Sequence, residues 1–197
     1  MAKPPSSSSC WVWFLSVATL IHMRTVLSSS RCYTAIYSFG DSIADTGNLY
    51  YDTEEDLSPS VYTALNPPYG ETFFHHPTGR FSDGRIIIDF LAEHIGVPLL
   101  KPYLGIKNGK IKDWNSLEGV NFAIGSATAL DISFFLEKGI YEVVVPTNYS
   151  LGVQFDWFMD LLPSICNNSS SGCKKFSEGL CLLLERLVAM ISTIFFN

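Results

Sequence analysis

The stretch "AIYSFGDSIADTGN", residues 35–48, joins a short apolar run to a turn that presents Ser42. The β-branched, aromatic and apolar residues of "AIYSF" (35–39) predict a buried strand that ends at Gly40. Gly40 lets the chain turn without a side chain in the way, so we expect Ser42 at the carboxyl edge of a sheet. The stretch therefore predicts either a nucleophilic Ser42 or a capping role for Asp41 and Ser42 on the next helix.

Strands and helices are predicted to alternate along the rest of the chain. Apolar residues at helical spacing predict a helix from an N-cap at Asp83 to a stop at Gly96. Its core residues are expected to be Ile87, Phe90, Leu91 and Ile95. A strand and a tight turn are predicted in "GVNFAIGSATAL" (119–130), and a helix that stops at Pro163 in "SLGVQFDWFMDLLP" (150–163). This alternation favours an α/β fold with a largely parallel sheet.

The first thirty residues have the layout of a secretory signal peptide. An apolar run, "WVWFLSVATLI" (11–21), follows a segment with a single cation and precedes small residues. Ser28 and Ser30 offer a small-x-small cleavage site before Arg31. We therefore predict a signal peptide over residues 1–30 and a secreted, extracellular protein, with a stop-transfer anchor as the alternative.

Charge narrows the classes of partner. The chain carries 13 Lys and Arg against 19 Asp and Glu, a net charge of −6. Loss of the signal peptide, which holds Lys3 and Arg24 and no acidic residue, makes the charge more negative. An acidic surface does not attract nucleic acid or anionic membrane, so neither partner is expected.

The cysteines and asparagines also fit an oxidising compartment. Across "NNSSSG", Cys166 and Cys173 are predicted to form a small-loop disulfide. Glycosylation sequons lie at Asn148, Asn167 and Asn168, and only one of the last two is expected to be occupied. No CxxC or HxxxH spacing exists, so no metal site is predicted.

Longer motifs point to a family. "FGDSIADTGN" (39–48) resembles the first signature block of the GDSL esterase/lipase, or SGNH hydrolase, family. Further blocks resemble its plant-type branch, closest to the sinapine-esterase-like and acetylajmalan-esterase-like subgroup. They are "NPPYGETFFHHPTGRFSDGRIIIDFLAEHIGVPLL" (66–100), "GVNFAIGSATAL" (119–130) and "SLGVQFDWFMDLLPSIC" (150–166). The resemblance implies that residues 31–176 are the N-terminal part of a GDSL hydrolase domain.

The family resemblance carries expectations about fold and chemistry. It implies a three-layer α/β/α sandwich with a parallel, flavodoxin-like sheet, here truncated. It implies that Ser42 attacks the carbonyl of a small ester or acyl-lipid substrate without a cofactor. The family's oxyanion hole takes the serine N–H, a glycine N–H from the second block and an asparagine from a GxND block. Ser42 matches the first donor, and the Gly125–Ser126 turn matches the second, with Ser126 where the family commonly has glycine.

The residues that would complete the catalytic site are missing from the sequence. Neither a GxND block nor the DxxH block that supplies the family's acid and base is present. The histidines are His22, His75, His76 and His94, none of which stands in such a block. Because loss of a triad histidine can lower kcat by about 10⁶-fold, we expect the chain as written to be inactive. The alternatives are a non-catalytic binding protein and a truncated product without function.

From about residue 177 the sequence departs from the family. Permitted codons for "GLCLLLERLVAMIST" (179–193), read two bases later, give "SLSPIGEIGGNDFN". "GEIGGND" resembles the missing GxND block, so we predict that residues 177–197 are a divergent, frameshifted tail. A membrane or lipid-anchor tail is the alternative. Glu185 and Arg186 within the apolar run argue against it, so no stable membrane anchor is expected.

Overall fold

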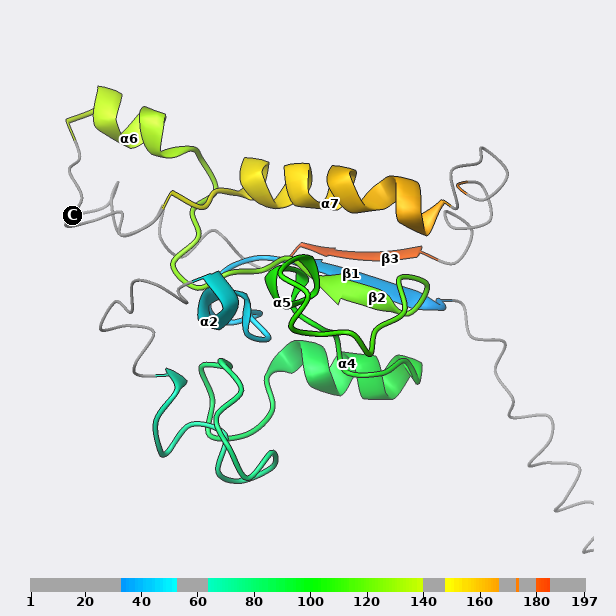
Figure 1. The fold of residues 1–197 in the computed structure, drawn as a ribbon. Helices are drawn as coiled ribbons and strands as arrows, with labels where there is room; N and C mark the ends of the chain where they lie inside the picture. The colour runs from blue at the N-terminus through cyan, green and yellow to red at the C-terminus, as the bar shows by residue number, and fades with distance from the viewer. Residues whose placement is uncertain (1–32, 53–63, 140–147, 167–172, 174–179, 185–197) are drawn as a thin grey trace, which may run out of the picture. The chain divides into compact units, whose positions relative to one another are not determined.

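A computed structural model describes residues 33–52, 64–139, 148–166, Cys173 and 180–184 (Figure 1). The predicted signal peptide, Asn167, Asn168 and most of the predicted frameshifted tail lie outside the described residues.

The described residues form an α/β fold around a three-stranded parallel sheet of order β2-β1-β3. Its strands are β1 (Ala35–Phe39), β2 (Gly119–Asn121) and β3 (Leu180–Leu184). The predicted strand over residues 35–39 and the parallel sheet are therefore confirmed. In the register, Ile36 lies opposite Gly119, while Leu184 lies opposite Phe39. β3 falls within residues 177–197, where the sequence analysis predicted no strand.

Successive β1 side chains pack toward different helices. Tyr37 and Phe39 belong to a core cluster with Trp157 of α7 (Leu151–Ile165). Ile36 belongs instead to a cluster with Ile88 of α4 (Ile87–Ile95). This alternation is expected of a strand buried on both faces, because successive side chains point to opposite sides of a sheet. Figure 1 shows α7 and α4 with the sheet between them.

The predicted core face of α4 is wrong for Ile87 and Phe90. Ile87 is 63% exposed and Phe90 51% exposed, while Ile88, Asp89 and Ala92 are buried. The physical reason is a buried ion pair between Asp89 and Arg80, which requires Asp89 to face the protein interior. Leu91 and Ile95 are partly buried against the cluster around Ile88.

The bounds predicted for α4 and for α7 each differ from the structure at one end. The N-cap position of α4 is Ile86 rather than Asp83, and the Ile86 N–H donates to the Asp89 carboxylate. Its predicted end is confirmed, since Gly96 has φ of +78° and its N–H donates to the Ala92 carbonyl. α7 continues past Pro163 to Ile165, because a proline in the last turn removes one helical hydrogen bond without ending the helix.

Short helices complete the described part of the fold. They are α2 (Asn48–Asp52), α5 (Tyr103–Lys107) and α6 (Ile132–Glu137). In the parts of the chain that the structure describes, no helix is both long enough and apolar enough to cross a bilayer.

Candidate active site

Ser42 lies two residues beyond Gly40, at the carboxyl end of β1. Ser42 and the preceding Asp41 are partly exposed, and the following Ile43 is 51% exposed. Asp41 closes the turn, because its carbonyl accepts hydrogen bonds from the N–H groups of Ala44 and Asp45. The Asp41 carboxylate also accepts from the Ile43 N–H at 3.0 Å. Ser42 is thus held on a tight turn with its own residue accessible.

The turn is anchored to α7 by Gln154. The Gly40 N–H donates to Gln154 Oε1 at 2.9 Å, and Gln154 Nε2 donates to the Gly40 carbonyl at 2.9 Å. Gln154 is fully buried. The sequence analysis did not identify this residue. The sequence does hold a signal for Gln154, because it falls on the buried stripe of α7, where a polar side chain needs a hydrogen-bond partner. The residues of this stripe are Gln154, Trp157, Leu161 and Ile165.

Asp45, rather than Asp41 or Ser42, caps the helix that follows. Its carboxylate accepts hydrogen bonds from the N–H groups of Gly47, Asn48 and Leu49, at and just before the start of α2. It also accepts one from the N–H of Gly125. The capping alternative for Asp41 and Ser42 is therefore wrong for α2. Burial raises the pKa of Asp45 to about 6, although the four N–H donors act in the opposite direction.

The Gly125–Ser126 turn follows a segment that runs beside β1. The Phe122 N–H donates to the Ser38 carbonyl at 2.8 Å, and the Ile124 N–H donates to the Gly40 carbonyl at 3.3 Å. A Cβ added to Gly125 would lie 2.7 Å from Leu49 Cδ2 and 3.0 Å from Phe81 Cε2, so a side chain there would have to displace these neighbours. Its N–H donates to Asp45 Oδ2 at 2.8 Å.

Ser126 holds a left-handed backbone conformation, with φ of +66°. Such a conformation costs a residue with a Cβ roughly 1–2 kcal/mol, which explains why glycine suits this position. Within the described part of the chain, no acceptor bonds the Ser126 N–H. Among the described residues, the Gly125 N–H therefore has an acceptor in this turn and the Ser126 N–H has none.

The described histidines make no hydrogen bond to Ser42. His75 Nδ1 lies 3.1 Å from the Glu71 carbonyl, and His76 Nδ1 lies 2.6 Å from the Phe74 carbonyl. Both side chains are exposed, as is His94 on α4. Among the described residues there is also no cluster of three His, Cys, Asp or Glu side chains that could hold a metal.

A buried ion pair ties the Ser42 loop to α4. Arg80 binds Asp89 in a bidentate manner, with Nε–Oδ2 and Nη2–Oδ1 distances of 2.9 Å. Arg80 Nη1 donates to the Thr46 carbonyl at 3.2 Å and to Thr78 Oγ1 at 3.3 Å. One guanidinium thus joins α4 to the chain four residues beyond Ser42.

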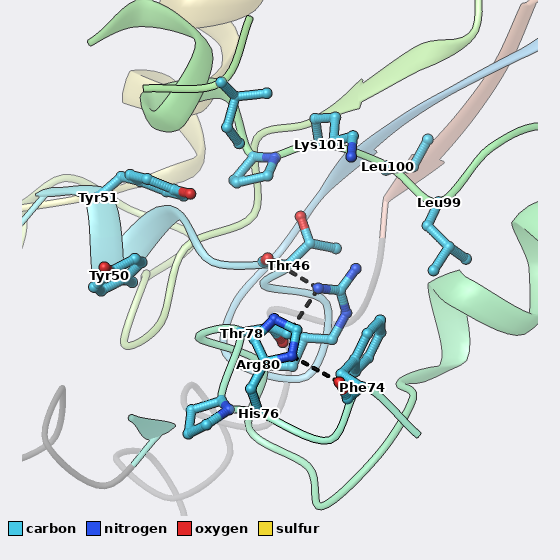
Figure 2. A pocket seen from close by; sticks show the side chains of 13 residues that line it. Thr46, Tyr50, Tyr51, Phe74, His76, Thr78, Arg80, Leu99, Leu100 and Lys101 are labelled. Atoms are coloured by element: carbon cyan, nitrogen blue, oxygen red, sulfur yellow. Dashed lines mark hydrogen bonds between the residues drawn. The ribbon is translucent and has the colours of Figure 1, made fainter. Parts of the chain in front are cut away.

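A cavity of about 460 Å³ lies beside this ion pair (Figure 2). Ser42 is not among its lining residues. The lining residues are Thr46, Tyr50, Tyr51, Phe74, His76, Pro77, Thr78, Arg80, Leu99, Leu100, Lys101, Pro102 and Ile111. The cavity therefore adjoins the loop that carries Ser42 without containing the serine.

The remaining predicted sites lie away from this turn in sequence. The structure holds a disulfide between Cys166 and Cys173, just after α7. Asn148 is exposed, two residues before the N-cap of α7 at Ser150.

Comparison with known proteins identifies the family. The family described as GDSL-like Lipase/Acylhydrolase matches residues 36–163, and the chain belongs to this family. A GDSL esterase/lipase of Arabidopsis thaliana is 44% identical over 185 residues, which cover 92% of this chain and 44% of the relative. Sinapine esterase of Brassica napus is 50% identical over 158 residues, which cover 80% of this chain and 38% of that protein.

The chain spans about two fifths of the length of the curated relatives it matches. No match to a solved structure was found. The predicted membership of the plant GDSL esterase/lipases is thereby confirmed.

Proposed function

We propose that this chain carries the nucleophile of a secreted GDSL-type ester hydrolase, and that the nucleophile is Ser42. In the proposed reaction Ser42 Oγ loses its proton to a base and attacks the ester carbonyl carbon. The alcohol leaves with a proton, and water then hydrolyses the acyl-serine. The observation that carries this proposal is the tight, anchored turn at the carboxyl end of β1, in a chain of this family.

The oxyanion of the tetrahedral intermediate would be bound by the N–H groups of Ser42 and of the Gly125–Ser126 turn. The commitment of the Gly125 N–H to Asp45 favours the Ser126 N–H as the second donor. A third donor would be the asparagine of the GxND block. No cofactor is required for this chemistry.

The base of this reaction is proposed to lie outside the 197 residues. The described histidines bond to backbone carbonyls or lie on α4, and the sequence holds no DxxH block. The matched relatives are more than twice as long, so their remaining length can supply an acid and a base. We infer that the chain as written has no turnover.

The frameshift hypothesis for residues 177–197 rests on the sequence alone, because β3 (Leu180–Leu184) lies within the residues that the shifted frame would replace. Leu184 lies opposite Phe39, so a chain leaving β3 starts from the same edge of the sheet as Gly40 and Ser42. In the shifted frame, "GEIGGND" begins at the codons for residues 184 and 185. If the shifted codons for residues 180–184 also form a strand in this register, the asparagine of "GEIGGND" would follow that strand within a few residues. We propose that the domain in that frame completes a three-layer α/β/α sandwich.

Small esters, phenolic esters or acyl lipids are the proposed substrates. Sinapine esterase, by its name, acts on one such ester. Secretion is proposed from the predicted signal peptide, with glycosylation at Asn148 supported by its exposure.

A transcript analysis and a labelling experiment test these proposals. Sequencing the transcripts across the codons for residues 170–197 should reveal an intact frame that encodes "GEIGGND" and a later DxxH. A fluorophosphonate should then label that longer chain at Ser42, and Ser42→Ala should abolish the label. A longer chain labelled equally well after Ser42→Ala would exclude Ser42 as the nucleophile.

A further inference from the structure

The glycosylation sequon at residues 148–150 overlaps the start of α7. Asn148 is exposed, whereas Ser150, the third residue of the sequon, is 0% exposed and is the N-cap residue of α7. We propose that Asn148 accepts a glycan only while this segment is unfolded, so that glycosylation and the folding of the segment compete. The proposal rests on the secretion proposed above, because such sequons are used in secreted proteins.

The hydroxyl that the sequon requires is engaged on both sides. Ser150 Oγ donates to the Asp131 carboxylate and accepts a hydrogen bond from the Val153 N–H at 3.2 Å. A serine hydroxyl carries one proton, so the contact with Asp131 uses its only donor. A sequon needs serine or threonine at its third position. An enzyme that reads this hydroxyl cannot reach one that is buried and already bonded.

The backbone of the sequon is held as well. Ser150 lies opposite Thr128 in an isolated parallel β-bridge. The Thr128 N–H donates to the Tyr149 carbonyl at 3.1 Å, and the Leu151 N–H donates to the Thr128 carbonyl at 2.9 Å. The Tyr149 hydroxyl donates to Asp52 at the end of α2. These contacts must open before an enzyme can bind the sequon, which amounts to local unfolding.

The product of the reaction fits the folded chain, although the folded chain is not the acceptor. In the transfer, Asn148 Nδ2 forms a bond to the anomeric carbon of a sugar, and the bond from that carbon to the diphosphate of a lipid-linked oligosaccharide breaks. The amide loses one proton, and the lipid diphosphate leaves. Because Asn148 is exposed, an attached glycan can extend into solvent. Each copy of the chain is therefore glycosylated at Asn148 before this segment folds, or remains without that glycan.

Transfer by a purified oligosaccharyltransferase compares the two states directly. The acceptors are the folded 197-residue chain, made in bacteria without glycans, and a peptide of residues 144–154, which holds the sequon without the rest of the fold. Asn167→Gln and Asn168→Gln remove the other two sequons from the chain. Mass spectrometry should show transfer to Asn148 at least about tenfold faster in the peptide than in the folded chain.

Leu117→Thr provides the matched control. It creates a sequon at Asn115, where Asn115 is exposed and Leu117 is 57% exposed. The folded variant should accept a glycan at Asn115 and not at Asn148. Asp131→Ala removes the acceptor of the Ser150 hydroxyl and should raise transfer to Asn148, whereas Ser150→Thr keeps a hydroxyl there and should not.

Three results would overturn the proposal. They are equal rates for the peptide and the folded chain, equal transfer to Asn115 and Asn148 in folded Leu117→Thr, and no transfer to the peptide. The last result would mean that the sequon is not an acceptor in either state. Secretion is tested separately, by the presence of the chain in the medium of expressing cells, so its failure is distinguishable from these results.

Discussion

Gln154 and Gly40 lie 114 positions apart in the sequence, yet the side-chain amide of Gln154 forms hydrogen bonds with both the N–H and the carbonyl of Gly40. Both hydrogen bonds are 2.9 Å long and fully buried. Because Gly40 precedes the Ser42 turn directly, α7 fixes where that turn leaves β1. Gln154 is thus a positioning residue for the proposed nucleophile.

Gln154→Leu should destabilise the protein by about 1–3 kcal/mol, because it leaves the buried Gly40 N–H without a partner and leaves the Gly40 carbonyl with the Ile124 N–H alone. Gln154→Glu keeps an acceptor for the Gly40 N–H, but it loses the amide N–H that donates to the Gly40 carbonyl and buries a charge. It should therefore also destabilise the protein. Denaturant unfolding monitored by circular dichroism measures both. Asp156→Asn, on an exposed position of α7, is the control. A stability loss in Gln154→Leu no larger than that of the control would contradict this role.

Arg80→Lys should destabilise the protein by about 3 kcal/mol, although it preserves the charge. Lysine cannot reproduce the bidentate contact with Asp89 while also donating to the Thr46 carbonyl. A double-mutant cycle with Asp89→Asn measures the coupling. The exposed pair of Arg85 and Glu93 is the matched comparison, with an expected coupling of about 0.2–1 kcal/mol. Equal coupling free energies in the two pairs would show that burial does not strengthen the interaction between Arg80 and Asp89.

Stability should depend on the protonation of Asp45. Burial raises the pKa of Asp45 from 3.8 to about 6, so the native state binds this proton more tightly than the unfolded state. Its contribution is therefore most favourable below about pH 4 and is lost as the pH rises to about 6, by up to roughly 3 kcal/mol. The free energy of unfolding of the wild type, minus that of Asp45→Asn, should fall over this range. A rise would mean that the four N–H donors outweigh burial.

Ser126→Gly should raise the free energy of unfolding by up to about 1 kcal/mol. The substitution relieves the left-handed conformation at φ of +66°, offset in part by the greater freedom of glycine in the unfolded chain. The neighbouring Gly125→Ala should have the opposite effect, since its Cβ would meet Leu49 at 2.7 Å. Thermal unfolding of the two variants checks both signs. Destabilisation by Ser126→Gly would mean that the serine side chain makes a compensating contact.

Local patterns predicted much of the scaffold. The apolar run before Gly40 gave the strand β1, and Gly96 gave the end of α4, because each depends on neighbouring residues alone. The core face of α4 was mispredicted because periodicity ranks residues by hydrophobicity. Periodicity could not show that Asp89 would form an ion pair with Arg80, nine positions earlier, and so face the protein interior.

The candidate site was predicted less completely than the fold. The motif indicated Ser42 and the Gly125–Ser126 turn, whereas the hydrogen bonds of Gln154 and Asp45 came only with the structure. Both depend on segments that meet in space, since Gly125 is 80 positions from Asp45. A polar residue at a core position of a helix, as at Gln154, is the signal that sequence analysis can use for such partners.

The most direct test of the central claim is Ser42-dependent ester hydrolysis in two chains. One is the chain of 197 residues, and the other is the longer chain read in the shifted frame from the same locus. With p-nitrophenyl acetate, the longer chain should turn over and lose that activity in Ser42→Ala, while the 197-residue chain should match its own Ser42→Ala variant. Ser42-dependent turnover by the 197-residue chain would show that its base lies within these residues and would contradict the account.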